Sequence, residues 1–255
     1  MFLVIGAGGV GQAVAGRFYS LGSEVCLVRR PHQVVHAPYP VTTDWQRVPI
    51  EHVKGVFLCV RDRQIASVAE ELSGWLRSPS VLVHTAGSVP LDALQAVYKG
   101  PCGVMYPLQS FTVGYPIRWG SFPVFWEGAS EVESWALLLT GRADQVCMAT
   151  STERLRIHIG AVFTANFLNA LFHAADTIGK PRADWRSYLP LAESVLEKLH
   201  HLDPLKAQTG PAWRGDLLTI ERHLQVLQES YPHLTAVYEL LSSYIQHYVA
   251  QSSRQ

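Results

Sequence analysis

The stretch Met1-Phe2-Leu3-Val4-Ile5-Gly6-Ala7-Gly8-Gly9-Val10-Gly11 decides the fold of this chain. Its apolar start predicts a buried strand, and the residues from Gln12 to Leu21 carry apolar side chains at helical spacing. Between them, Gly6 permits a tight turn, Gly8 lets the backbone approach a pyrophosphate, and Gly11 lets the helix pack close to the sheet. The helix would direct its N-terminal N–H groups at the phosphates. We therefore expect a dinucleotide-binding βαβ unit, the alternative being a glycine turn in another kind of α/β protein.

Two arginines follow the second predicted strand, Glu24 to Val28. A site that prefers NAD usually has Asp or Glu here to accept the ribose hydroxyls, whereas this chain has Arg29 and Arg30. A guanidinium can bind a 2′-phosphate through two charge-assisted hydrogen bonds. The pair predicts NADP as the cofactor, unless one arginine is only solvated and the other stacks on adenine.

Strands and helices alternate as far as about Met148, and only helical periodicity follows. The fold class predicted is α/β: a doubly wound, mostly parallel sheet over residues 1–150, followed by a smaller all-α domain over residues 151–255. Ligands bind beyond the carboxyl ends of the strands in such sheets. The predicted cofactor-binding residues are Gly6, Ala7, Gly8, Gly9, Val10, Gly11, Arg29, Arg30, Val60, His84, Thr85 and Ala86.

The composition excludes several classes of protein. Acidic and basic residues are equal in number, 21 each, so the chain lacks the basic field that nucleic-acid binding needs. Only 16% of the 255 residues are charged and 48% are hydrophobic, which indicates a buried subunit interface. We expect a cytoplasmic protein with neither a signal peptide nor a membrane span. The four cysteines have no metal-ligand spacing, so we expect reduced, buried thiols and no metal.

Polar residues on the long predicted helix, Thr152 to Ile178, are the first candidates for chemistry. His158 could act as a general acid, and Asn166, an amide in apolar company, could orient a substrate. Asn169 and His173 follow on roughly the same stripe. The alternative is that these side chains only hydrogen-bond to a neighbouring helix or to a dimer mate.

Two turns supply further candidates. Arg214 could clamp a substrate carboxylate or phosphate, with Asp216 either holding the arginine or capping the following helix. His84 could contact nicotinamide or substrate, while Ser88 could cap the helix predicted from about Leu91 to Val97.

Six stretches together resemble one family, the Rossmann-like proteins with a C-terminal helical domain of unknown function. The six stretches are Gly6-Ala7-Gly8-Gly9-Val10-Gly11, Val56 to Val60, His84 to Leu91, Tyr106-Pro107-Leu108-Gln109-Ser110-Phe111, His158 to Leu168, and Thr209 to Asp216. Family members usually carry a provisional label of NADP oxidoreductase and are distant relatives of pyrroline carboxylate reductase, ketopantoate reductase and the phosphogluconate dehydrogenase group. The resemblance implies a helical domain that dimerises and an active cleft between the domains.

This chain departs from related enzymes at two places. Members of the family commonly have His before the Pro-Leu-Gln stretch, where this chain has Tyr106, so a proton role assigned to that histidine is in doubt here. No Lys lies between Ser151 and Ile178, so the helix lacks the catalytic lysine of the hydroxyacid dehydrogenases.

We therefore expect an NADP-dependent oxidoreductase that transfers hydride to or from a small carbonyl, imine or hydroxyl compound. His158 would donate the proton, Asn166 would orient the substrate, Arg214 would hold an anionic group, and the helical domain would form a homodimer. The alternatives are a non-catalytic NADP-binding sensor or interaction protein, and a vestigial glycine loop beside a cleft for another ligand.

Overall fold

The computed structural model describes residues 1–77 and 79–252. Its chain divides into two compact units, Met1–Ala165 and Asn166–Gln255. The division lies inside the long helix, at residue 165 rather than the predicted 150, because the first turns of that helix pack on the first unit. Arg154 is fully buried there and Ile157 packs against the apolar core of the sheet.

The first unit is built on an eight-stranded sheet with the order β3-β2-β1-β4-β5-β6-β7-β8. All neighbouring strands are parallel except β6 and β7, which are antiparallel. This arrangement confirms the predicted fold class. The strands are β1 (Phe2–Ile5), β2 (Val25–Val28), β3 (Val41–Thr42), β4 (Gly55–Leu58), β5 (Val81–His84), β6 (Cys102–Pro107), β7 (Val124–Gly128) and β8 (Val146–Met148).

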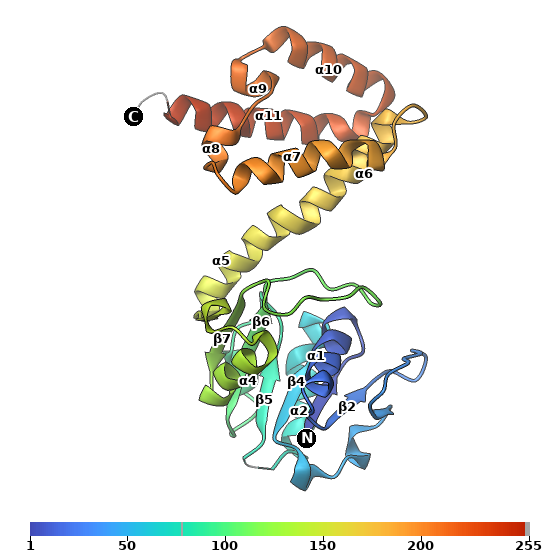
Figure 1. Ribbon diagram of the computed structural model, residues 1–255, viewed down its shortest axis with the longest axis vertical. Helices are drawn as coiled ribbons and strands as arrows, with labels where there is room; N and C mark the ends of the chain where they lie inside the picture. Colours follow the sequence, from blue (N-terminus) through green and yellow to red (C-terminus); the bar gives the residue numbers. More distant parts are fainter. Residues whose placement is uncertain (78, 253–255) are drawn as a thin grey trace. The chain divides into compact units, whose positions relative to one another are not determined.

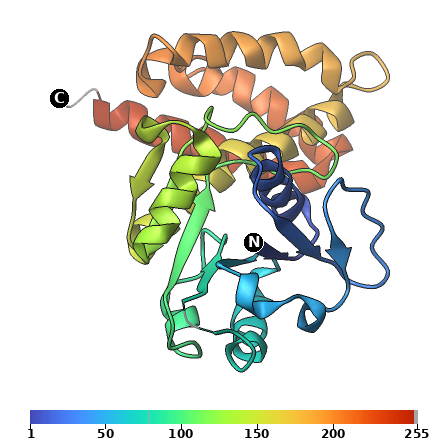
Figure 2. The ribbon, with the colours of Figure 1, turned by 60° about the horizontal axis from the view of Figure 1, so that its bottom comes forward.

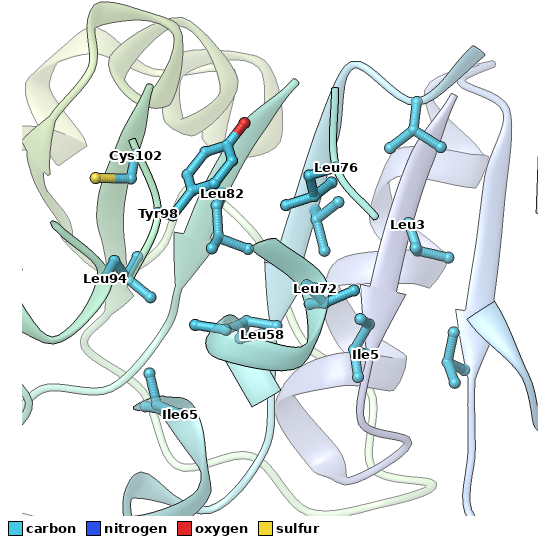
Figure 3. Packing of buried hydrophobic residues seen from close by; sticks show 14 of the residues in the cluster. Leu3, Ile5, Leu58, Ile65, Leu72, Leu76, Leu82, Leu94, Tyr98 and Cys102 are labelled. Atoms are coloured by element: carbon cyan, nitrogen blue, oxygen red, sulfur yellow. The ribbon is translucent and has the colours of Figure 1, made fainter. Parts of the chain in front are cut away.

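Helices cover both faces of this sheet, which explains why the central strands are continuously apolar. Helices α1 (Gly9–Ser20) and α4 (Ser130–Thr140) cover the same side of the strands (Figure 1) and enclose one apolar cluster. Helices α2 (Ile65–Ser73) and α3 (Asp92–Gln95) enclose the other, part of which is drawn in Figure 3. The short 3-10 helices are Trp45–Arg47, Ile50–His52, Asp62–Gln64, Ala143–Gln145 and Trp185–Tyr188.

The long helix is continuous but not uniform. It runs through α5 (Ser151–Ala161), a π-helical segment (Val162–Phe167) and α6 (Leu168–Gly179). A capping box between Thr150 and Glu153 starts it. The sequence periodicity predicted the helix but not its π segment, a feature that is frequent at functional sites.

This helix corrects the expectation that no stretch approaches a membrane span. Ser151–Gly179 is long and apolar enough to cross a membrane by length and composition, with a mean hydropathy of 1.3 over its most apolar window. The expectation is therefore corrected for length and composition alone. Helices of water-soluble proteins that pack against other helices meet the same criterion, so the finding is weak evidence for a span.

The second unit is entirely helical and has a small core of its own. Its further helices are α7 (Leu189–Leu199), α8 (Pro204–Ala207), α9 (Pro211–Arg214), α10 (Leu217–Ser230) and α11 (Pro232–Ser252), drawn from orange to red in Figure 2. Among its described residues, the buried hydrophobic side chains are Ala212, Ile220 and Leu227. Many larger apolar side chains, Leu191, Leu218 and Leu240 among them, are exposed.

Two local predictions were wrong. Helix α3 is a single turn, Asp92–Gln95, and Ser88 does not cap it, because the Ser88 hydroxyl donates to the Asp62 carboxylate instead. Cys26 and Cys102 are buried thiols as expected, but Cys147 is exposed because β8 lies at the edge of the sheet.

Candidate functional site

The glycine turn at the start of the chain has the geometry that its sequence requires. Gly6 has a φ of +110°, a conformation that side chains with a Cβ rarely adopt. A Cβ on Gly11 would lie 1.8 Å from the Gly6 carbonyl oxygen, so only glycine allows α1 to pack so close to the turn. A Cβ on Gly8 would meet no atom within 4 Å. The turn is therefore closed on the protein side at Gly6 and Gly11, and open to a ligand at Gly8.

Helix α1 begins directly behind the turn and has no side-chain cap. Gly8 is its N-cap residue and no acidic side chain occupies the first turn. The first N–H groups of a helix have no partner inside the helix, and the dipole gives this end a partial positive charge. The first turn of α1 can therefore bind an anion such as a phosphate.

A pocket of about 380 Å³ adjoins the turn at the carboxyl ends of β1, β2 and β4. Three arginines line it, Arg29, Arg30 and Arg61, and no Asp or Glu does. The Cys59 thiol in the wall stays neutral, because burial raises its pKa to about 12. The pocket thus combines three positive charges with no negative one. Its other lining residues are Ile5, Gly6, Ala7, Gly8, Val28, Pro31, Gln33, Thr43, Trp45, Val60, Gln64 and Val68.

The three arginines are held differently. Arg29 is partly buried, and its Nη1 donates to the backbone oxygens of Arg30 and Pro31 at 3.0 and 2.8 Å. The guanidinium of Arg29 therefore shapes the loop after β2. The side chains of Arg30 and Arg61 are exposed and make no hydrogen bond to another described residue. These two are free to bind an anion.

The prediction that the His84 side chain contacts the cofactor at the end of β5 needs correction. His84 is 0% exposed, its Nδ1 accepts the Ala86 N–H at 3.2 Å, and burial lowers its pKa to about 4. A neutral, enclosed imidazole cannot touch a ligand in this conformation, so His84 supports the turn instead. Thr85 and Ala86 lie in that turn and remain predicted cofactor contacts, as do Gly9, Val10 and Gly11 in the first turn of α1.

Two residues from distant parts of the sequence meet beside this turn. The hydroxyl of Tyr106, at the end of β6, lies 3.1 Å from Nδ1 of His158 on α5. The two rings meet edge to face, with centroids 5.7 Å apart. Gly87 packs against the same imidazole, since a Cβ there would lie 2.7 Å from Nδ1. The residue that departs from the family pattern is thus the partner of the predicted proton donor.

A buried ion pair that the sequence pattern did not predict anchors α5. Arg154 is 0% exposed, pairs with the Glu127 carboxylate from β7, and donates to the Val89 carbonyl at 2.6 Å. Ser151 joins the network, because its hydroxyl donates to Glu127 and accepts the Leu91 N–H. The network fixes the start of α5 against β7 and the loop after β5, and so places His158. An arginine on the apolar face of a predicted helix is the signal that could have revealed it.

The second unit carries the remaining candidates. Asn166 is exposed in the π segment, and Arg214 is exposed at the last position of α9. Asp216 caps α10 by accepting the Thr219 N–H at 3.1 Å and its hydroxyl at 2.8 Å, and these bonds lower the pKa of the carboxyl. Capping is therefore the observed role of Asp216, while the roles of Asn166 and Arg214 stay predictions.

Comparisons with known proteins agree on the fold and identify a family. A family model described as "Domain of unknown function (DUF2520)" matches residues 122–245. A solved structure from Bacteroides fragilis, described provisionally as an NADP oxidoreductase, is 30% identical with a TM-score of 0.87, and the match covers 96% of this chain and 97% of that one. No curated protein sequence matches the chain.

More distant structures share the fold alone. A protein from Thermotoga maritima is 20% identical with a TM-score of 0.69, and the match covers 100% of both chains. A reductive aminase from Aspergillus terreus, solved with NADPH and ethyl levulinate, is 14% identical with a TM-score of 0.66, over 96% of this chain and 93% of that one. On the strength of the Bacteroides match, the chain belongs to the family of Rossmann-fold, NADP oxidoreductase-like proteins with a DUF2520 domain.

Proposed function

We propose that this protein is an NADP-dependent oxidoreductase that transfers hydride to or from a small carbonyl, imine or hydroxyl compound. The observation that carries the proposal is the pocket beside the glycine turn, lined by three arginines and no carboxylate. The description of the Bacteroides fragilis relative as an NADP oxidoreductase supports the same cofactor.

The residues of the pocket fit NADP. Gly8 leaves room for the pyrophosphate, and the uncapped first turn of α1 would bind its charge. Arg30 and Arg61 would hold the 2′-phosphate, a dianion that a carboxylate in this position would repel. The bound cofactor would supply or accept the hydride.

The spacing of the strands supports a nicotinamide position near His158. The arginine pocket lies over the ends of β2, β1 and β4, and Tyr106 and His158 meet at the end of β6. Four strand spacings separate β2 from β6 in the sheet order, which is about 19 Å. A dinucleotide extended along this edge of the sheet would carry its nicotinamide toward the histidine, which we propose as the proton donor.

The helical unit suits a homodimer. Its exposed apolar side chains include Leu191, Leu218 and Leu240, each at least two-thirds exposed. Monomeric soluble proteins rarely leave so many apolar side chains in water. A second copy of this neutral chain would cover them without charge repulsion. We propose a cytoplasmic homodimer, in which Asn166 orients the substrate and Arg214 binds an anionic group of it.

The proposal is tested by NADPH oxidation with a panel of ketones, aldehydes and cyclic imines, followed at the absorbance of the reduced nicotinamide. Turnover with at least one compound is expected, and His158→Gln should lower kcat by at least about 100-fold, the usual contribution of a general acid. Tight NADPH binding without turnover on the whole panel would contradict the proposal and identify a non-catalytic NADP-binding protein.

A further inference from the structure

The hydrogen bond between Tyr106 and His158 determines which nitrogen of the histidine ring carries the proton. Tyr106 is 8% exposed and its phenol oxygen lies 3.1 Å from Nδ1 of His158. Either the phenol O–H donates to Nδ1, or an Nδ1–H donates to the phenol oxygen. The tautomer of a neutral histidine is set by the hydrogen bond that one of its nitrogens makes.

Burial of the phenol decides between these two arrangements. Among the described residues, the Tyr106 hydroxyl has His158 as its one hydrogen-bond partner. If Nδ1 were the donor, the O–H group would be left without an acceptor inside the protein, which is unfavourable for a buried donor. Burial also raises the pKa of Tyr106, so the phenol keeps its proton at neutral pH. Nδ1 is therefore the acceptor, and the proton of the neutral ring is on Nε2.

Gly87 keeps the ring in this orientation. The loop after β5 packs so closely on the Nδ1 side that a Cβ at residue 87 would lie 2.7 Å from Nδ1 and 2.8 Å from Cγ. The Nδ1 edge is thus enclosed by Gly87 and Tyr106. The Nε2 atom, on the far side of the ring, makes no hydrogen bond to the described residues, and the side chain is partly exposed.

We propose that Tyr106 is a positioning residue that holds His158 as the neutral Nε2–H tautomer, so that the substrate atom facing this histidine is a hydrogen-bond acceptor, such as the oxygen of a ketone or aldehyde, and not the nitrogen of a protonated imine. The inference rests on the proposed function and narrows its substrate class. A protonated imine has no lone pair to accept from Nε2–H, so it gains nothing from this arrangement.

The pair can then deliver a proton without forming an imidazolium ion. As hydride adds to the carbonyl carbon, the C=O π electrons move to oxygen, which takes the Nε2 proton. The Tyr106 proton passes to Nδ1, so the ring stays neutral and the phenol becomes a phenolate. The carbonyl gains the two electrons of the hydride that a bound cofactor would supply, and it is reduced to an alcohol. A proton from water then enters at the partly exposed Nε2, and Nδ1 returns its proton to the phenolate, which restores the Nε2–H tautomer. Proton delivery by a positioned pair of this kind is general acid catalysis.

The tautomer can be measured without any substrate. Long-range ¹H–¹⁵N correlation spectra of ¹⁵N-labelled protein at pH 8 distinguish a protonated from an unprotonated ring nitrogen, and His158→Gln assigns the signal. The expected result is an unprotonated Nδ1 and a protonated Nε2 at His158. A protonated Nδ1 in the wild-type protein would overturn the proposal, whether or not the protein turns over NADPH.

Substitution of the phenol provides the second readout. Tyr106→Phe removes the donor, so the His158 signals should shift toward a mixture of tautomers and kcat should fall at least about tenfold with little change in KM or in NADPH affinity. The control is Tyr98→Phe, which removes a buried hydroxyl that donates to the Ser80 carbonyl at 2.7 Å, away from the site. Unchanged His158 signals in Tyr106→Phe would contradict the positioning role.

The substrate class has its own test. Ketones and aldehydes should be reduced with a higher kcat/KM than cyclic imines assayed at a pH where these are protonated. Faster reduction of the protonated imines would overturn the assignment of the acceptor. No reduction of either class would overturn the proposed function and the substrate class together, while the NMR result would still decide the tautomer.

Discussion

The two units of the chain bury their apolar residues very differently. In Met1–Ala165 the strands lie between two apolar clusters, and residues such as Phe2, Phe18 and Phe57 have no exposed surface. Among the described residues of the unit Asn166–Gln255, few hydrophobic side chains are buried, and leucines such as Leu240 are exposed. The first unit thus provides its own interior, whereas the second leaves a surface that something else must cover. Substitutions in the first unit should therefore change the stability of the chain much more than substitutions at the exposed apolar side chains of the second.

The largest effect is expected at the buried ion pair of the first unit. Glu127→Ala leaves the fully buried guanidinium of Arg154 without its partner, which should lower the free energy of unfolding by about 3–5 kcal/mol in urea titrations. Asp144→Ala breaks the exposed pair between Asp144 and Arg142 and should lower the free energy of unfolding far less, because solvent screens exposed charges. Equal losses in the two variants would show that Arg154 is solvated in solution.

The close packing of α1 on the glycine turn predicts the next effect. Gly11→Ala places a methyl group 1.8 Å from the Gly6 oxygen and should destabilise the protein by about 3 kcal/mol. Gly16→Ala, on the same helix but with no atom within 4 Å, should instead stabilise it by about 0.5–1 kcal/mol. Thermal unfolding of both variants measures the change in stability. A change of the same sign in both variants would show that α1 does not pack closely on the Gly6 carbonyl.

His84 predicts a pH dependence. Its pKa is lowered from 6.5 to about 4 by burial and by the charge of Arg154, so below pH 6.5 the unfolded chain takes up a proton that the folded chain does not. This contribution to stability is complete above pH 6.5 and is lost as the pH falls to 4, by as much as about 3 kcal/mol.

Urea unfolding of the wild type and of His84→Asn between pH 4 and 7.5 isolates that contribution, because the carboxylates are common to both proteins. The two stability curves should converge as the pH falls. Parallel curves would mean that His84 titrates normally in the folded protein.

The smallest effect on the stability of the single chain is expected in the second unit. Leu191→Glu changes a residue that is 67% exposed, so the free energy of unfolding of the single chain should fall by no more than about 0.5 kcal/mol. The same change should convert a dimer into a monomer in sedimentation equilibrium. The matched control, Val113→Glu, alters an exposed side chain of the first unit and should leave the dimer intact. A monomeric wild-type protein would contradict the proposed homodimer.

Local patterns predicted the first unit well because its determinants are local. The apolar run Phe2 to Ile5, the glycines after it and the arginines after β2 each act through neighbouring backbone, so their positions follow from short stretches of sequence. The change from alternating to helical periodicity likewise predicted the second unit, although the compact units divide at residue 165.

The features of the site that were not predicted depend on tertiary contacts between residues far apart in the sequence. Tyr106 and His158 are 52 residues apart in the sequence, and Val89 and Arg154 are 65 apart. The enclosure of His84 follows from the same packing, which local polarity could not indicate. The π segment, Val162–Phe167, shows no signal in the apolar periodicity.

Calorimetric titration of NADPH and NADH into the protein tests the proposed cofactor most directly. We expect NADPH to bind at least about tenfold more tightly than NADH, and the double variant Arg30→Ala, Arg61→Ala to lose this preference. Arg47→Ala, an exposed arginine that does not line the pocket, should retain it. No binding of NADPH, or an unaltered preference for NADPH in the double variant, would contradict the proposed NADP site.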